Sequence, residues 1–338
     1  MQISIIVPLY NRPQEIDELL QSLVNQTNKN FEVIVVEDGS TNKSEDIVNG
    51  YANKLNVKYF YKDNSGPGQT RNYGAERASG NYLIFFDSDC IIPQNYIEIV
   101  LQSLEKEYVD AFGGPDATLP NFTVTQKAIG YAMTSFLTTG GIRGGSEKAG
   151  KFHPRSFNMG IAKDAFAKTG GYSTMRFGED IDLTLRILEA GLSTKLIKDA
   201  FVYHKRRTDL RKFYRQVFNS GCARINLNVR HKGSLKLVHT LPAAFFLGNV
   251  FLIVCLAVSI TFKSLMFSLL CIVPQLLFSL LILADSTARN GFLVGIKSVP
   301  AAWVQLCGYG MGFVKAVWCR LILKQQFDTT GFVKNFYK

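Results

Sequence analysis

Residues 81–90 (NYLIFFDSDC) constrain the fold more than any other stretch of this chain. The five consecutive apolar residues 82–86 are typical of a strand that is buried on both faces of a sheet. The run ends abruptly in Asp87, Ser88 and Asp89. Two carboxylates this close are costly to bury unless a cation lies between them. The pattern therefore favours a divalent metal that holds a diphosphate, and the alternative is a solvated acidic turn.

Strands and helices are expected to alternate through the first half of the chain. Four apolar runs predict strands, at residues 2–9, 31–36, 57–61 and 82–86. Amphipathic spacing predicts a helix that begins at Pro13. A further helix is expected around residues 71–78, after the loop at residues 65–68. Glu37 and Asp38 close the second strand as the acidic turn closes the fourth. The alternation predicts an α/β sheet covered by helices on both faces, with ligands at the carboxyl ends of its strands.

Two long apolar runs without a charge mark the second half, at residues 241–262 and 265–284. Each is long enough to cross a bilayer, and the two-residue gap between them suggests a helical hairpin. A buried pair of core helices is the alternative. A third run, 298–314, is interrupted by proline and glycine and could span the bilayer, re-enter it or lie at the interface. The basic residues that follow it favour the interface.

Positive charge is concentrated just before the hairpin. Residues 205–236 contain ten Lys or Arg and one acid, Asp209. Such a block could bind nucleic acid, but its position beside two apolar runs favours a juxtamembrane segment. The first eleven residues have no basic region typical of a signal peptide, so the catalytic part is expected in the cytosol. The six cysteines form no C-x-x-C pair and are expected to be reduced and packed.

Four motifs occur in the order and spacing of a known family. They are VPLYN at residues 7–11, VEDGS at 36–40, Arg71-Asn72 with ASG at 78–80, and FDSD at 86–89. Together they resemble the family 2 glycosyltransferases of the GT-A fold, over roughly residues 2–204. The resemblance implies a Rossmann-like mixed sheet with helices on both faces. It also implies a nucleotide-sugar donor, usually a UDP-sugar, and a divalent metal, Mg or Mn.

The resemblance assigns the nucleotide-sugar to the first half of the chain. Its expected contacts are Pro8, Tyr10, Asn11, Glu37, Asp38, Arg71, Asp87 and Ser88. In the family, the residues matching Pro8 and Tyr10 line the base pocket, and the residue matching Asp38 accepts a hydrogen bond from the base. Glu37 stands where an aspartate is usual. Asp89 is expected to bind the metal together with Asp87 and His204, although a lone histidine is more often structural.

The acceptor side is assigned to the stretch after residue 150. Residues 156–160 (SFNMG) resemble the family's acceptor segment and include Asn158 and Met159. Residues 177–183 (FGEDIDL) match its catalytic motif, with Asp180 as general base and Glu179 as its neighbour. Helix-dipole stabilisation is the alternative explanation of these acids. Residues 122–139 could form an amphipathic helix that touches membrane or acceptor, or simply packs, and the glycine-rich residues 140–150 could form a mobile loop near the site.

The sequence predicts an inverting, metal-dependent hexosyl- or N-acetylhexosaminyltransferase. The expected parts are a glycosyltransferase domain (1–205), a basic interfacial segment (206–240), a membrane region (241–323) and a tail (324–338). The expected partners are a nucleotide-sugar, a lipid-linked or membrane glycan acceptor of the cell envelope and the bilayer, without nucleic acid. The expected location is the cytoplasmic membrane, multi-pass, with the catalytic domain in the cytoplasm. Processive members of the family that this chain resembles usually carry a Q-x-x-R-W box at this point. No such box follows residue 205, so transfer of one or a few sugars is favoured.

Other function classes remain as alternatives. The acceptor could be soluble or a protein. A sugar nucleotidyltransferase shares the acidic site, but it usually has a glycine-rich basic loop near its start, which residues 7–12 are not. A glycoside hydrolase needs two carboxylates but no nucleotide motifs. A non-enzymatic membrane scaffold would have a degenerate site, and a dinucleotide oxidoreductase would have G-x-G-x-x-G after its first strand.

Overall fold

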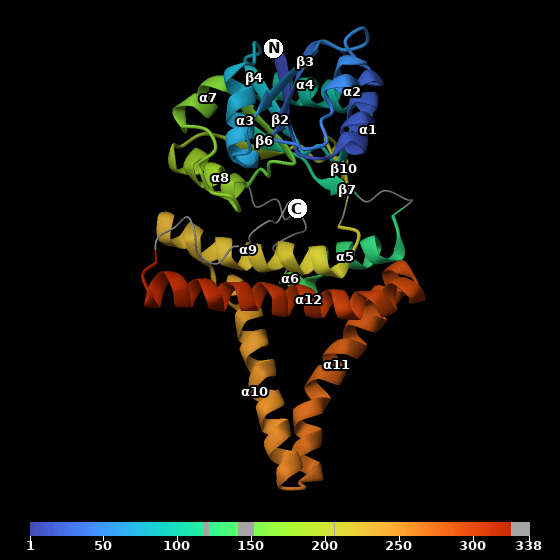
Figure 1. The fold of residues 1–338 in the computed structure, drawn as a ribbon, viewed down its shortest axis with the longest axis vertical. Coiled ribbons are helices and arrows are strands. Elements are labelled where there is room, and N and C mark those ends of the chain that lie inside the picture. The colour runs from blue at the N-terminus through green and yellow to red at the C-terminus, as the bar shows by residue number, and fades with distance from the viewer. Residues whose placement is uncertain (118–121, 141–151, 206, 326–338) are drawn as a thin grey trace. The chain divides into compact units, whose positions relative to one another are not determined.

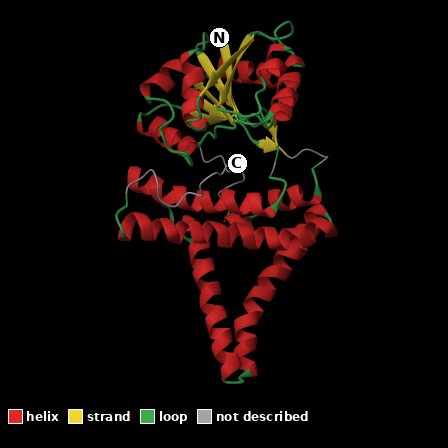
Figure 2. Cartoon of the chain, in the orientation of Figure 1, coloured by secondary structure: helices red, strands yellow, loops and turns green. Residues whose placement is uncertain are grey.

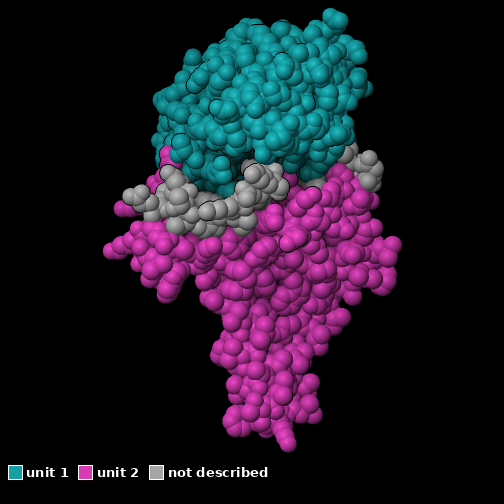
Figure 3. Space-filling model, in the orientation of Figure 1, with its two compact units in different colours: residues 1–119, 145–205 teal, residues 120–144, 206–338 magenta. Residues whose placement is uncertain are grey.

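The computed structural model describes residues 1–117, 122–140, 152–205 and 207–325. The chain divides into two compact units, which Figure 3 colours teal and magenta. Unit 1 comprises residues 1–119 and 145–205, and unit 2 comprises residues 120–144 and 206–338. The segment 120–144, expected within a continuous first domain, thus belongs with the helices of unit 2. The glycine-rich loop expected at 140–150 lies outside the described residues, apart from Gly140.

Unit 1 contains a mixed sheet of seven strands (Figure 2). Their order is β3 (Val57–Lys62), β2 (Phe31–Asp38), β1 (Ile3–Leu9), β4 (Tyr82–Phe86), β8 (Asn158–Ala162), β6 (Ala111–Gly113) and β9 (Thr194–Leu196). The first four strands run parallel to one another, whereas β8 runs antiparallel to both β4 and β6. A small second sheet has the order β5 (Cys90–Ile91), β10 (Val202–His204) and β7 (Asp116–Ala117).

Helices cover both faces of the large sheet (Figure 2). They are α1 (Pro13–Val24), α2 (Glu45–Asn49), α3 (Pro67–Glu76), α4 (Tyr96–Lys106), α7 (Lys163–Lys168) and α8 (Glu179–Glu189). The apolar stripe of α1 is fully buried, as its spacing predicts. Helix α3 approaches the sheet closely at Gly74, where a Cβ atom would lie 2.6 Å from Cγ2 of Ile6. A larger residue at this position would push the helix off the sheet.

The sequence-based outline of unit 1 is confirmed in its main elements. All four predicted strands are present, and the sheet has the expected α/β architecture. The helix expected at 71–78 begins earlier, at Pro67. Proline suits the first turn of a helix, because its fixed φ is helical and the N–H group that it lacks would have no partner there. The small sheet was not predicted, because strands of two or three residues carry no hydrophobic period.

Unit 2 is built from helices (Figure 1). They are α5 (Val124–Thr134), α6 (Phe136–Thr139), α9 (Leu210–Arg230), η1 (Leu237–His239), α10 (Leu241–Thr261), α11 (Leu265–Asn290), α12 (Phe292–Val317) and η2 (Trp318–Ile322). Helix α12 lies alongside α9, and glycine makes the approach close: a Cβ atom at Gly312 would lie 2.0 Å from the carbonyl oxygen of Phe218. The helix expected at 122–139 is divided at Ser135, whose backbone is extended.

Helices α10 and α11 form the predicted hairpin. They are the two helices, among the residues the structure describes, that are long and apolar enough to cross a membrane. Large apolar side chains on them are exposed, with Phe251 66% and Met266 76% accessible. Helix α12, which contains the third apolar run, does not meet this criterion and packs against α9, α10 and α11. The basic segment 206–240 includes α9, a helix that the charge pattern alone did not predict.

Candidate functional site

The carboxyl ends of β1, β2 and β4 lie side by side because these strands are parallel neighbours. The chain leaves β1 towards Tyr10, β2 towards Gly39 and β4 towards Asp87. Ligands of open α/β sheets bind at this edge. Motifs that are far apart in the chain therefore meet at one place.

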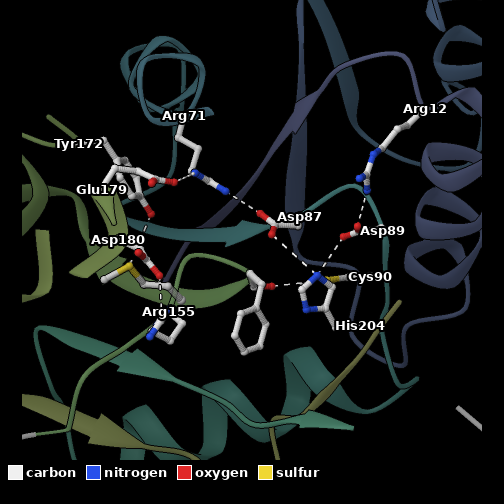
Figure 4. A network of polar contacts seen from close by, with 12 residues as sticks. Arg12, Arg71, Asp87, Asp89, Cys90, Arg155, Tyr172, Glu179, Asp180 and His204 are labelled. Carbon is white, nitrogen blue, oxygen red and sulfur yellow. Dashed lines mark hydrogen bonds and ion pairs between the residues drawn. The ribbon is translucent and has the colours of Figure 1, made fainter. Parts of the chain in front are cut away.

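His204 reaches the acidic turn through the small sheet. Strand β10 pairs antiparallel with β5 and places His204 opposite Cys90. The Nε2 atom of His204 lies 3.1 Å from Oδ1 of Asp89 and 3.9 Å from Oδ2 of Asp87 (Figure 4). Ligand atoms of Asp89, Cys90 and His204 all lie within 4.8 Å of one another. The structure thus brings together the three residues predicted as metal ligands and adds a cysteine.

The donor set fits a hard divalent cation. Carboxylate oxygens and a neutral imidazole are ligands that Mn²⁺ accepts, and the carboxylates also suit Mg²⁺. Cys90 is a poor ligand for such an ion, because burial raises the pKa of its thiol well above the usual value. The thiol instead faces the carbonyl oxygen of Phe157 at 3.6 Å. The Phe157 ring stacks on the imidazole of His204, with 5.1 Å between ring centroids, and so orients it.

Arg12 approaches the same turn from the residue that precedes α1. Its Nη1 donates to Oδ2 of Asp89 (Figure 4). The two oxygens of Asp89 therefore face two different nitrogens, one from Arg12 and one from His204. The side chain of Asp89 is 9% exposed, whereas that of Arg12 is 26% exposed.

Arg71 connects the acidic turn to the start of α8. Its Nη2 donates to Oδ1 of Asp87 at 2.5 Å, and its Nη1 donates to Oε1 of Glu179 at 3.2 Å. Its guanidinium lies 5.3 Å from the ring centroid of Tyr172. Only 3% of the Arg71 side chain is exposed. The structure therefore places Arg71 between two acids, with little surface left for the nucleotide contact predicted from the sequence.

Glu179 and Asp180 begin α8, and their side chains are only 10% and 12% exposed. Burial, together with the charge of Asp180, raises the pKa of Glu179 above its usual range. Burial alone would also raise the pKa of Asp180. However, the charge of Arg155, whose Nε donates to Oδ2 of Asp180 at 2.6 Å, outweighs burial and lowers this pKa. Asp180 is therefore ionised at neutral pH, and Glu179 binds a proton more readily.

Asp38 organises the loop that leads into α3. Its Oδ1 accepts from Nζ of Lys62 at 2.6 Å and from the backbone N–H of Ser65 at 2.9 Å. Its Oδ2 accepts from the backbone N–H of Gly66 at 2.9 Å. The predicted contact with a nucleobase would fall to Oδ2, which accepts one hydrogen bond and has a second lone pair, because Oδ1 already accepts two.

Glu37 lies away from the nucleotide position predicted for it. Consecutive strand residues point to opposite faces, so Glu37 and Asp38 diverge. Glu37 is fully buried, and its Oε2 accepts from the backbone N–H of Ser44 at 2.9 Å and from the hydroxyl of Tyr59 at 2.5 Å. A bound nucleotide has no access to this side chain in the structure. Its interactions hold the loop after β2 against β3.

Asn11 joins two turns at the edge of the sheet. Its backbone has a φ of 51°, and its Oδ1 accepts from the backbone N–H groups of Thr41 and Asn42 at 2.9 and 3.0 Å. Pro8 and Tyr10, on the same stretch, are half-buried. Ser88, in the acidic turn, is buried.

The two acceptor-side residues predicted from the sequence, Asn158 and Met159, are fully buried in β8. Oδ1 of Asn158 accepts from the hydroxyl of Tyr96 at 2.5 Å, and its Nδ2 donates to the carbonyl oxygen of Ala200 at 2.8 Å. The sulfur of Met159 accepts from the hydroxyl of Tyr172 at 3.6 Å. Both side chains are fully buried and have no surface that an acceptor could touch in this structure.

The motifs and their arrangement agree with a comparison to protein families. Residues 4–170 match the family described as glycosyl transferase family 2. Residues 4–170 form a glycosyltransferase family 2 domain. The matched residues include Arg12, Asp38, Arg71 and the acidic turn, whereas α8 and His204 lie beyond them.

Curated relatives are similar to this chain over part of their length. An uncharacterized glycosyltransferase of Rickettsia bellii is 38% identical over 105 residues, which are 31% of this chain and 15% of that protein. The minor teichoic acid biosynthesis protein GgaB of Bacillus subtilis is 28% identical over 212 residues, which are 61% of this chain and 23% of that protein. The chain thus spans less than a quarter of each.

A solved structure shares the fold. It is the mannosyltransferase PcManGT of Pyrobaculum calidifontis in complex with GDP-Man and Mn²⁺, with a TM-score of 0.62 and 15% identity. The similarity covers 94% of this chain and 88% of PcManGT. The similarity supports the fold of this chain.

Several polar residues of the site were not predicted from the sequence: Arg12, Lys62, Cys90, Arg155 and Tyr172. Arg12 directly follows the VPLYN motif, and Arg155 directly precedes the SFNMG segment. A search for basic residues flanking the acidic motifs would have found both, because buried carboxylates require counter-charges. The strand register that brings Cys90 beside His204 left no such signal.

Proposed function

We propose that this chain transfers a sugar from a nucleotide-sugar, with a UDP-sugar as the first candidate, to a membrane-associated acceptor. One observation carries the proposal: Asp87, Asp89 and His204 lie at the same sheet edge as the Glu179–Asp180 pair, within unit 1. Arg71 joins the two groups through both of its terminal nitrogens. The proposed diphosphate site and the proposed base would then lie next to each other, as glycosyl transfer requires.

Asp89, Asp87 and His204 would hold a divalent cation, Mg²⁺ or Mn²⁺. When bound, such an ion neutralises charge on the departing nucleoside diphosphate. The family match and the Mn²⁺ in the structurally similar mannosyltransferase support the use of a divalent metal. The chemistry of the donor set supports it independently.

Asp180 is the proposed general base of an inverting reaction. The acceptor oxygen attacks the anomeric carbon from the face opposite the diphosphate and loses its proton to the Asp180 carboxylate. The bond between the anomeric carbon and the phosphate oxygen breaks, and the nucleoside diphosphate leaves with the electron pair. Arg155 keeps Asp180 ionised, which a base requires, while lone pairs not used by Arg155 remain for the proton. Glu179 is its proposed neighbour in the acceptor pocket.

The acceptor is proposed to be a lipid-linked glycan or a membrane lipid of the cell envelope. Support comes from the apolar α10–α11 hairpin, the ten basic residues at 205–236 and the name of the relative GgaB. We infer from the same features a multi-pass protein of the cytoplasmic membrane, with the catalytic unit in the cytoplasm.

The test is nucleotide release by the purified full chain in detergent. A panel of UDP- and GDP-sugars is incubated with Mn²⁺, with Mg²⁺ and with EDTA, in the presence and absence of lipid-linked acceptors. Release from one sugar nucleotide that disappears with EDTA and in Asp89→Ala is the expected result. Asp180→Asn should retain nucleotide binding and lose turnover.

Two outcomes would contradict the proposal. If calorimetric titration detects no binding of UDP or GDP with Mn²⁺, the transferase function is wrong. If a soluble acceptor is used as well as a lipid-linked one, by the full chain and by a chain without residues 241–290, the membrane acceptor is wrong.

A further inference from the structure

Arg12 occupies a position that the proposed metal also needs. Its Nη1 donates to Oδ2 of Asp89, and Oδ1 of the same carboxylate faces His204 at 3.1 Å. A cation bound between Asp89 and His204 would therefore lie next to the guanidinium of Arg12. Two like charges on one carboxylate repel each other, and the repulsion is strong because Asp89 is 9% exposed.

The two arginines at the acidic turn, both labelled in Figure 4, differ in burial and in the number of acids that they pair with. Arg71 is 3% exposed and is held by Asp87 and Glu179 together. Arg12 is 26% exposed, and Asp89 is the one ion-pair partner recorded for it among the described residues. Rotation of its long side chain would release Asp89 without disturbing the fold, whereas Arg71 cannot leave its acids without leaving both uncompensated.

The placement of Arg12 suits a diphosphate. It is the N-cap residue of α1, at the carboxyl end of β1, beside the acidic turn after β4. A guanidinium forms two parallel hydrogen bonds with phosphate oxygens and keeps its charge at all physiological pH values. A diphosphate between the metal and Arg12 would be attracted by both cations and would offset their mutual repulsion.

We propose that Arg12 binds the diphosphate of the donor and, in its absence, competes with the divalent cation for Asp89. The inference deepens the proposed function and rests on it. Its consequence is that metal and nucleoside diphosphate bind cooperatively. The diphosphate draws Arg12 away from Asp89 and so removes the charge repulsion that opposes metal binding, and the metal takes the place of Arg12 on Asp89 and so frees Arg12 for the diphosphate. By linkage, the factor by which the nucleotide tightens metal binding equals the factor by which the metal tightens nucleotide binding.

The test measures metal binding without catalysis. The full chain in detergent is titrated with Mn²⁺, and free Mn²⁺ is followed by electron paramagnetic resonance, with and without UDP or GDP. Arg12→Gln should bind Mn²⁺ alone at least tenfold more tightly than the wild type. Cooperativity between Mn²⁺ and the nucleoside diphosphate should fall at least tenfold. Arg12→Lys keeps the positive charge but not the two parallel N–H donors of the guanidinium. Its Mn²⁺ affinity and cooperativity should lie between those of the wild type and of Arg12→Gln.

Arg77→Gln is the matched control. Arg77 has a similar exposure, 33%, but lies at the end of α3, where it pairs with Glu76 and contacts Tyr73. Its removal should change neither Mn²⁺ affinity nor cooperativity. If Arg12→Gln binds Mn²⁺ with wild-type affinity and wild-type cooperativity, the inference is wrong while the proposed function stands. If neither Mn²⁺ nor a nucleoside diphosphate binds to the wild type, the proposed function itself fails.

Discussion

Replacing Glu32 by glutamine tests how a buried carboxylate stabilises unit 1. Oε1 of Glu32 accepts from the hydroxyl of Ser4 at 2.6 Å and from the backbone N–H and hydroxyl of Ser79 at 2.6 and 2.8 Å. Its Oε2 accepts from Nζ of Lys58 at 2.9 Å. The side chain is 2% exposed. Glu32 thus ties β2 to β1, to β3 and to the loop before β4.

The expected magnitude follows from the pKa of Glu32. Burial alone would raise this pKa, but the hydrogen bonds outweigh burial and lower it from 4.5 to about 2. At about 1.4 kcal/mol per pKa unit, the ionised carboxylate contributes about 3 kcal/mol to the free energy of unfolding. Because the folded-state pKa is the lower one, this contribution is complete above pH 4.5 and is lost as the pH falls towards 2.

The assay must report on unit 1 in the full chain. Both tryptophans, Trp303 and Trp318, lie in unit 2 and are unsuitable. Cys90 is 1% exposed and is the one cysteine among residues 1–205, so its reaction with a thiol reagent follows the unfolding of unit 1. The protein in detergent is equilibrated in urea and pulsed with an aromatic disulfide that reacts at acid pH. The peptide containing Cys90 is then quantified by mass spectrometry.

Glu32→Gln should lower the urea midpoint of Cys90 labelling by about 1 M at pH 7, since m is about 2 to 3 kcal/mol/M for a domain of this size. The difference in urea midpoint between wild type and variant should narrow as the pH falls from 4.5 towards 2. Glu107→Gln is the control, because Glu107 pairs with Lys195 at the surface and is 66% exposed. Its midpoint should match the wild type. An unchanged midpoint for Glu32→Gln at pH 7, or a gap that is as large at pH 3 as at pH 7, would refute the reasoning.

Three further changes probe the fold and the site. Gly74→Ala should destabilise unit 1 by about 1 to 3 kcal/mol in the Cys90 labelling assay, because its Cβ would lie 2.6 Å from Cγ2 of Ile6; wild-type stability would contradict the close approach. Phe157→Leu should weaken Mn²⁺ binding about tenfold, because the ring that orients His204 is lost; titration monitored by paramagnetic resonance measures it. Asp180→Asn should slow nucleotide release with acceptor by about 10² to 10⁴ at unchanged Mn²⁺ affinity, and a normal rate would exclude Asp180 as the base.

The sheet and its acidic edge were predictable, because each depends on local pattern. A buried strand such as β4 needs an unbroken apolar run, and its polar end must lie at the sheet edge. The small sheet was not predictable, because its short strands exist only through their partners. The same applies to Arg12: a single basic residue after a motif has no period, and only the approach of β1 to β4 brings it to Asp89.

Of two adjacent residues, one can be buried in the interior and the other can lie at the site, and the sequence does not show which. Glu37 and Asp38 were both predicted to contact the nucleotide. The pleat of β2 sends Glu37 into the interior, to Ser44 and Tyr59, and leaves Asp38 at the edge. Asn158 and Met159 matched an acceptor segment, yet β8 lies between β4 and β6 and buries both.

The sequence by itself determined the family, the α/β architecture, the acidic motifs and the apolar hairpin, because hydrophobic period, run length and motif order are local properties. Only the tertiary structure decided how the charges of the site are balanced. Arg12 and Arg155 each pair with one acid and Arg71 pairs with two, and these pairs join residues that are 16 to 108 positions apart. Contacts over such separations depend on strand order and register, which arise when the whole domain packs.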